Sequence, residues 1–346
     1  MTRPTTSRSA PSRSLLAAGL LTAALTVTAC GDDDPGTAGS GGGDAAVKVV
    51  ATTTQLGDFA REVGGDRVDV TQLLQANSDP HDYEPRPQDL REATGAKVMF
   101  VSGDDLDAWS GDVAKQAGIE GAVLDVGQGR PVEREGGHEH EDEEHAEEEG
   151  GKHSEEEGDE HGDVDPHWWH DPRNVEYAAQ RIATKLAEVD PAGAPDYRAR
   201  AAAYVTKVRA LDQRLQRCFS AVPAAQRKLV SDHDAFGYLA ARYDIEVVGA
   251  IIPATTTQAQ ASAGELTALA RTIETEGVRA IFPESSLNPK LAEAISQRTG
   301  AKVGGTLYAD TLGPEGSAGA TYLSSEQANA DALVRGFTGR STGCAS

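Results

Sequence analysis

The segment Asp165-Pro166-His167-Trp168-Trp169-His170-Asp171-Pro172 gathers side chains that can bind a metal ion. It sets two imidazoles beside two carboxylates, and its prolines disfavour a helix until Asp171 and Pro172, which suit an N-cap and a first helical position. Nitrogen and oxygen donors on a stiff loop favour metal coordination. The alternative is a proline-rich loop whose tryptophans pack on the core while its histidines face solvent.

Three further donors each come just after a predicted strand: His81, His233 and Asp310. Open α/β sheets bind their ligands beyond the carboxyl ends of strands, so these side chains and His167 can meet in one cleft. Taken singly, each has an ordinary alternative as a hydrogen-bonded loop histidine or as a carboxylate in a turn or helix cap. Together, three nitrogen donors and one carboxylate suit tetrahedral Zn²⁺, whereas Mn²⁺ favours more oxygen donors.

The elements that would position these donors alternate between strand-like and helix-like runs, as in βαβ units. Strands are predicted over residues 47–51, 68–74, 97–101, 122–126, 228–231, 246–251, 278–282 and 302–307. Helices are predicted near residues 56–63, 88–94, 106–117, 175–189, 236–242, 263–276, 289–298 and 325–337. The run 196–219 lacks Gly and Pro, so a helix of roughly 36 Å can span both halves of the chain.

This pattern predicts an α/β fold of two lobes, each a parallel-type β-sheet flanked by helices, joined by one long rigid helix. The 346 residues exceed one ordinary domain. We expect an N-terminal lobe over 46–190, a linking helix over 191–221 and a C-terminal lobe over 222–346. A stiff connector favours local motion over large domain closure.

The N-terminal residues have the pattern of an export signal. Three arginines precede a mostly apolar run over 15–29, which is shorter than the roughly 20 residues of a transmembrane helix. Val27-Thr28-Ala29-Cys30 resembles the lipobox of bacterial lipoproteins, in which the cysteine carries the lipid. We therefore expect a signal peptide over 1–29, lipidation of Cys30 and a flexible tether over 30–45. The alternative is a plain secretory signal with an incidental cysteine.

Two cysteines remain once Cys30 is assigned to the lipid. In an oxidising exterior, Cys218 and Cys344 most simply form a disulfide, which would tie the C-terminus to the middle of the chain. Two unpaired thiols are the alternative.

The tract 133–163 carries much of the negative charge. It holds 16 Asp and Glu residues, and the chain has a formal net charge of −23, which disfavours nucleic acid as a partner. Because Ala146 is its only apolar residue, we expect a disordered loop. A merely solubilising loop is one interpretation. The other is weak, exchangeable metal capture, since the tract contains five of the nine histidines, namely His138, His140, His145, His153 and His161.

Four segments, taken in order, resemble the signature segments of a known family. They are His81-Asp82-Tyr83-Glu84-Pro85-Arg86-Pro87, the segment 165–172, Asp232-His233-Asp234-Ala235-Phe236-Gly237-Tyr238 and Leu307-Tyr308-Ala309-Asp310-Thr311-Leu312. They resemble the metal-binding cluster of ABC-transporter substrate-binding proteins, in particular its zinc-uptake branch, over about residues 47–337.

The resemblance implies two α/β lobes joined by one long helix, with Zn²⁺ between them and His81, His167, His233 and Asp310 as ligands. The manganese branch of the family typically has a glutamate where His233 stands. The zinc branch often has a His-rich loop in the place of residues 133–163.

Two further polar residues are candidates for the surroundings of the metal. His170 departs from the family pattern, which more often has an apolar residue there, and it could lie near the metal, form a second-shell hydrogen bond or face solvent. Glu284 follows a predicted strand, and we expect it to support the cleft by hydrogen bonding.

The expected function is that of an extracytoplasmic lipoprotein that captures Zn²⁺ and passes it to the ABC permease of a zinc importer, with a metallochaperone as a candidate loading partner. A manganese-specific member of the fold, or a surface adhesin or zinc buffer, is the first alternative. A secreted zinc hydrolase is the second, although catalytic zinc usually keeps a position open for water and neither Gly-x-Ser-x-Gly nor His-Glu-x-x-His is present.

Overall fold

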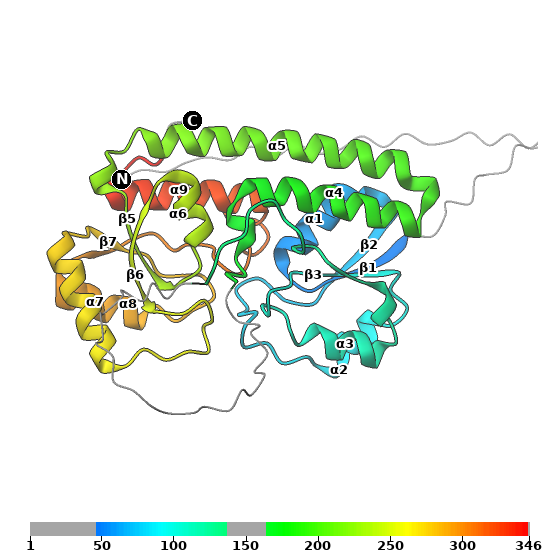
Figure 1. Ribbon diagram of the computed structural model, residues 1–346, viewed down its shortest axis with the longest axis horizontal. Helices are drawn as coiled ribbons and strands as arrows, with labels where there is room; N and C mark the ends of the chain where they lie inside the picture. Colours follow the sequence, from blue (N-terminus) through cyan, green and yellow to red (C-terminus); the bar gives the residue numbers. More distant parts are fainter. Residues whose placement is uncertain (1–45, 137–163, 345–346) are drawn as a thin grey trace, which may run out of the picture. The chain divides into compact units, whose positions relative to one another are not determined.

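A four-stranded parallel sheet organises the first half of the structure, a computed structural model that describes residues 46–136 and 164–344 (Figure 1). The strands lie in the order β2, β1, β3, β4, and all their pairings are parallel. Their bounds are β1 (Val47–Ala51), β2 (Val68–Gln72), β3 (Val98–Val101) and β4 (Val123–Asp125).

Helices cover both faces of this sheet because its buried strands are apolar on both sides. In β3, for example, Val98 and Phe100 join one core while Met99 and Val101 join another. The first core includes residues of α1 (Thr54–Gly64), α4 (Pro172–Val189) and α5 (Ala194–Ser220), and the second includes residues of α2 (Pro87–Ala93) and α3 (Ser110–Ala117).

The second half also pairs its strands in parallel, with two longer strands and two of only two residues. β5 (Lys228–His233) pairs in parallel with β6 (Glu246–Ile252), and β7 (Ala280–Ile281) pairs in parallel with β8 (Lys302–Val303). A parallel bridge between Ser231 and Phe282 connects the two pairs. The remaining helices are α6 (Gly237–Tyr243), α7 (Ala263–Glu276), α8 (Lys290–Thr299) and α9 (Tyr322–Thr338).

Helix α5 runs past both sheets and packs on helices of both halves (Figure 1). Its 27 residues correspond to about 40 Å of helix. It contacts α1 and α4 on one side of the molecule and α6 and α9 on the other, so one continuous core holds residues from both halves. These features confirm the predicted α/β fold with parallel sheets, flanking helices and a long helix. The proposed boundaries at 46–190, 191–221 and 222–346 stay a prediction.

The segment 165–172 ends in the expected helix start, and a short 3₁₀ turn precedes it. Asp171 is the N-cap of α4, where its carboxylate accepts a hydrogen bond from the Arg173 backbone N–H at 2.9 Å, and Pro172 is the first helical residue. A single 3₁₀ turn, Trp168–His170, precedes this cap.

Several predicted boundaries differ from those in the structure, three of them next to residues of the site or of the sheets. The helix expected from residue 106 begins at Ser110, because the Asp107 carboxylate accepts hydrogen bonds from the Ser102 and Gly103 backbone N–H groups and holds the preceding residues in a turn. The strand expected over 302–307 ends at Val303, ahead of a glycine pair. The strand expected to end at residue 231 continues to His233.

The predicted disulfide between Cys218 and Cys344 is present, with a Cα–Cα distance of 5.3 Å. It joins the last turn of α5 to the C-terminal end of the described chain across 126 residues of sequence. Closure of so long a loop removes many conformations from the unfolded chain.

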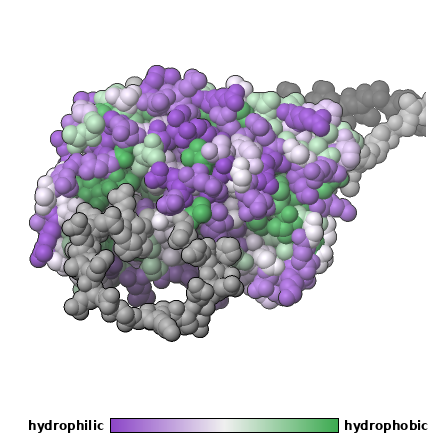
Figure 2. Space-filling model, in the orientation of Figure 1, coloured by the Kyte–Doolittle hydropathy of each residue, from purple (hydrophilic) through white to green (hydrophobic). Residues whose placement is uncertain are grey.

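The face of the molecule drawn in Figure 2 is largely hydrophilic, with scattered apolar side chains. Among the described residues, the large apolar side chains that are exposed are Val164, Val247, Leu291 and Val303. Over the same ranges of the chain, no helix combines the length and apolar character needed to cross a bilayer.

Candidate metal centre

Four potential ligands from distant parts of the chain converge at one point. One ligand atom from each of His81, His167, His233 and Asp310 lies within 4.8 Å of all the others. The side chains of His167, His233 and Asp310 are fully buried, and that of His81 is partly exposed. The Asp310 Oδ1 atom is 3.2 Å from the Nε2 atom of His167 and 3.6 Å from that of His233.

Two of the donors come from the ends of sheet strands, and two come from loops. His233 is the last residue of β5, and Asp310 follows the parallel bridge between Glu284 and Leu307 that continues the same sheet. His81 lies in the loop between β2 and α2, and His167 directly precedes the 3₁₀ turn before α4. The carboxyl ends of the strands in both halves therefore supply or adjoin the site, as the sequence predicted.

Buried carboxylates hold two of the imidazoles from behind. The Nδ1 atom of His167 is 2.7 Å from an Asp165 oxygen, and the Nδ1 atom of His233 is 2.6 Å from a Glu284 oxygen. Each carboxylate also accepts the backbone N–H of the histidine that it holds, at 3.0 Å and 2.9 Å. Such contacts fix the ring orientation and direct both Nε2 atoms to the centre of the cluster.

Asp165 escaped the sequence-based selection of site residues, although a repeated motif marks it. Asp79-Pro80-His81 and Asp165-Pro166-His167 share the spacing Asp-Pro-His. In both, the aspartate Oδ1 atom accepts the histidine backbone N–H, at 2.9 Å for His81 and 3.0 Å for His167. The repeat could have indicated that each histidine is held by an aspartate two residues earlier.

The carboxylates in and around the cluster stabilise positive charge within it. Burial alone would lower the pKa of His167, but the carboxylates of Asp165 and Asp310 outweigh it and raise the pKa to about 10. Glu284 and Asp310 similarly outweigh burial and raise the pKa of His233 to about 9. Burial alone would raise the pKa of Asp310, and the surrounding imidazoles instead hold it below its usual range.

His81 behaves differently, because burial dominates and lowers its pKa to about 3. Its Nε2 atom and both carboxylate oxygens of Asp310 are buried, and they have no hydrogen-bond partner among the described residues. Buried polar atoms normally have partners. One ligand atom of His81 and one carboxylate oxygen of Asp310 lie within 4.8 Å of the other ligand atoms, so a metal ion would give these buried groups a partner, and the residues present fit a divalent cation.

His170 lies outside this cluster. It is buried rather than solvent-facing, its Nδ1 atom is 2.8 Å from a Glu326 oxygen of α9, and its ring packs on Phe236 at a centroid distance of 4.8 Å. No feature of the sequence indicated Glu326 as its partner, because the two residues are 156 positions apart.

The loop that carries His81 is tied to the second half of the molecule. The Asp79 carboxylate accepts a hydrogen bond from the Thr257 hydroxyl at 2.6 Å, and the Gln258 side-chain amide donates to the His81 carbonyl. Both partners lie between β6 and α7. Because His81 is the one partly exposed member of the cluster, these contacts lie on the side nearest solvent.

The other predicted site residues lie outside the described residues: Cys30, His138, His140, His145, His153 and His161.

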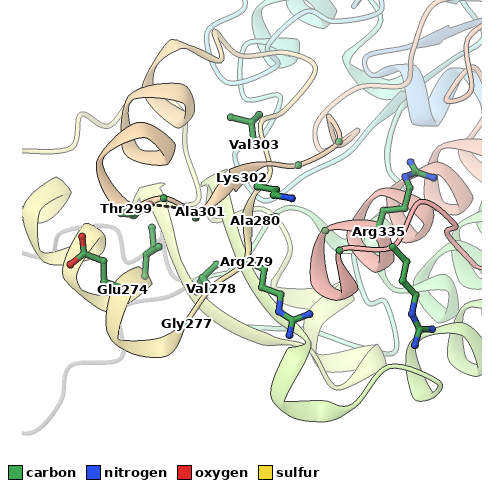
Figure 3. A pocket seen from close by; sticks show the side chains of 17 residues that line it. Glu274, Gly277, Val278, Arg279, Ala280, Thr299, Ala301, Lys302, Val303 and Arg335 are labelled. Carbon is green, nitrogen blue, oxygen red and sulfur yellow. Dashed lines mark hydrogen bonds between the residues drawn. The ribbon is translucent and has the colours of Figure 1, made fainter.

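A separate cavity of about 550 Å³ opens at the amino ends of β7 and β8 (Figure 3). Arg279, Lys302 and Arg335 line it with Glu274, and none of the four clustered ligands does.

Comparison with known proteins identifies the family. A family model described as "Zinc-uptake complex component A periplasmic" matches residues 49–336. The manganese-binding lipoprotein MntA of Halalkalibacterium halodurans is 28% identical over 92% of this chain and 97% of its own length. The iron-binding protein YfeA of Yersinia pestis is 31% identical over 84% of this chain and 86% of its own length. The zinc-binding protein AdcA of Streptococcus pyogenes is 29% identical over 74% of this chain and 49% of its own length.

Solved structures agree with these sequence relatives. The periplasmic zinc-binding protein TroA of Treponema pallidum matches with a TM-score of 0.72 at 26% identity, covering 85% of this chain and 99% of that one. A crystal structure of ZnuA matches with a TM-score of 0.67 at 27% identity, covering 82% and 96%. The predicted extracytoplasmic, membrane-anchored location is confirmed by relatives named as metal ABC transporter substrate-binding lipoproteins. The chain belongs to the family of zinc-uptake complex component A, and it is a metal-binding, substrate-binding protein of an ABC importer rather than an enzyme.

Proposed function

We propose that this protein captures Zn²⁺ with His81, His167, His233 and Asp310 and delivers it to the permease of a zinc importer. The convergence of three imidazoles and one carboxylate within 4.8 Å carries the proposal. The names of the relatives do not identify the metal, since they are called manganese-, iron- and zinc-binding. The donor set favours zinc, because tetrahedral Zn²⁺ takes nitrogen-rich sites while Mn²⁺ takes more oxygen donors.

Capture would proceed from the side of His81. This imidazole is neutral at physiological pH, since its pKa is about 3, and it is the partly exposed member of the cluster. Zn²⁺ would bind there first and then reach His167 and His233, whose rings Asp165 and Glu284 already orient. The protons that those carboxylates and Asp310 favour on the imidazoles would leave as the ion enters.

Membrane attachment and metal delivery extend this proposal beyond the described residues. Lipidation of Cys30 would hold the protein at the membrane that contains the permease. The histidines of the tract 133–163 would gather metal and pass it to the tighter cluster, and a metallochaperone is a second candidate source. The zinc hydrolase alternative is set aside, because the family consists of solute-binding proteins.

The test is a competitive titration of zinc against manganese on protein without the signal peptide and without residues 137–163. One tight zinc equivalent that manganese does not displace is expected. His233→Ala should abolish it. His170→Gln, which alters a nearby buried histidine outside the cluster, should retain it.

Manganese preference, or tight zinc binding that is indifferent to His233→Ala, would contradict the assignment. A manganese-specific protein is the second candidate, because both Asp310 oxygens are without a hydrogen-bond donor among the described residues and could bind one ion together. A passive buffer or adhesin would bind zinc equally well, so zinc-dependent growth of a deletion strain distinguishes transport from storage.

A further inference from the structure

No group outside the ligand cluster fixes the position of the Asp310 carboxylate in the part of the chain that the structure describes. Its close neighbours are the Nε2 atoms of His167 and His233, at 3.2 Å and 3.6 Å from Oδ1, and the side chain is fully buried. The two buried imidazoles have carboxylates behind them, whereas Asp310 depends on its backbone for its position. That backbone is held by residues of the other half of the molecule.

Three side-chain interactions form a chain from the first turn of α1 to the Asp310 loop. The Leu312 backbone N–H donates to the Thr54 hydroxyl oxygen at 2.8 Å. The Thr54 hydroxyl donates to the Gln55 amide oxygen at 2.9 Å. The Gln55 amide nitrogen donates to the Asp310 carbonyl at 2.9 Å. These three hydrogen bonds therefore connect the backbone at residue 312 with the backbone at residue 310 through the side chains of Thr54 and Gln55.

This closed arrangement also determines which way the Gln55 amide points. Because the amide oxygen accepts the Thr54 hydroxyl, the amide nitrogen is left to face the Asp310 carbonyl. It also lies 3.4 Å from the Ala309 carbonyl. Thr54 is 3% exposed and Gln55 is 2% exposed, so water cannot easily replace either bond.

We propose that Gln55 is a positioning residue for the ligand Asp310, and that Thr54 orients it. Gln55 itself touches no metal. It holds the backbone from which the carboxylate projects, and it does so from the half of the molecule that carries His81 and His167. The inference rests on the proposed function, since it concerns the affinity of the same site.

Gln55→Leu tests this role, because leucine has a similar size and lacks the amide. Loss of a residue that orients a metal ligand typically costs about 10- to 100-fold in affinity, and we expect zinc affinity to fall within that range. The measurement is a zinc titration against a chelating dye, with the melting temperature of the metal-free protein recorded in parallel.

Tyr197→Phe is the matched control. Tyr197 is fully buried and donates one hydrogen bond to Asp190 at 2.7 Å, at a distance in sequence from every ligand. This variant should lower the melting temperature and leave zinc affinity unchanged. Equal zinc affinity in Gln55→Leu and wild type would overturn the inference, and so would an equal loss of affinity in Gln55→Leu and Tyr197→Phe.

Thr54→Val provides a second variant if Gln55→Leu does not fold. Valine keeps the branched shape but loses the hydroxyl, so the Gln55 amide is free to turn, and zinc affinity should fall in the same direction by up to about tenfold. Unchanged affinity would count against the orienting role. Failure of the wild-type protein to bind zinc tightly through His233 would instead contradict the proposed function. The titration of the wild type and of His233→Ala therefore distinguishes the two failures.

Discussion

Zinc binding should release protons, because the metal-free cluster holds protons on the imidazoles that the metal requires. The pKa of His167 is raised to about 10 and that of His233 to about 9 by the carboxylates around them. Both values lie above neutral pH, so both rings favour the protonated form at pH 7.5. His81, with a pKa of about 3, has no proton to release there.

Geometry sets the range of the expected stoichiometry. The Nε2 atoms of His167 and His233 are 3.2 Å apart, which is the distance of a hydrogen bond with one proton between the rings. The raised pKa values favour a proton on each ring, while this contact favours one shared proton. Release of between about one and two protons per zinc is therefore expected at pH 7.5. The apparent zinc affinity should rise about 10- to 100-fold per pH unit below pH 8.

Isothermal titration calorimetry in buffers of different ionisation enthalpy measures the number of protons released. The protein should lack residues 137–163, because histidines there would release protons of their own. Stability of the metal-free protein should change in the opposite direction to zinc affinity. A raised histidine pKa stabilises the folded state below the unfolded pKa of about 6.5, and this contribution is lost as pH rises through about 9 and 10. A binding enthalpy independent of the buffer would refute the charge assignment.

Four further changes have defined outcomes. Glu284→Gln should weaken zinc binding about 10- to 100-fold, measured by dye competition, because His233 loses the carboxylate that orients it; an unchanged affinity would show that the contact is incidental. Cys218→Ser should cost about 2–5 kcal/mol of unfolding free energy in denaturant titrations and leave zinc affinity unchanged, since the disulfide is remote from the cluster; loss of zinc binding would contradict this separation. Zinc should raise the melting temperature strongly at pH 7.5 and much less at pH 5, and equal shifts would count against histidine ligands. Deletion of 137–163 should slow zinc loading at low zinc in stopped-flow measurements without changing equilibrium affinity, and loss of the main site would refute the loop's proposed role.

Much of the fold is readable from local patterns. The alternation of apolar runs predicts the strands of both sheets, because a strand buried on both faces needs continuous apolar residues. The stretch without Gly or Pro similarly predicts α5. Shorter elements were predicted less well: β8 ends at Val303, and the next residue, Gly304, lies where a side chain would collide with the Phe282 ring.

The sequence by itself determined the candidate ligands, since His81, His167, His233 and Asp310 each follow from a motif beside a strand or a proline-bounded loop. The partners that are far away in sequence came only from the tertiary structure. Glu284 was expected to support the cleft, but its pairing with His233, like that of His170 with Glu326 and of Gln55 with Asp310, joins residues 51, 156 and 255 positions apart. The local sequence shows which side chains can donate hydrogen bonds or bind a metal ion. The packing of two sheets against shared helices decides which groups meet, because burial forces each polar atom to find a partner wherever the fold has placed one.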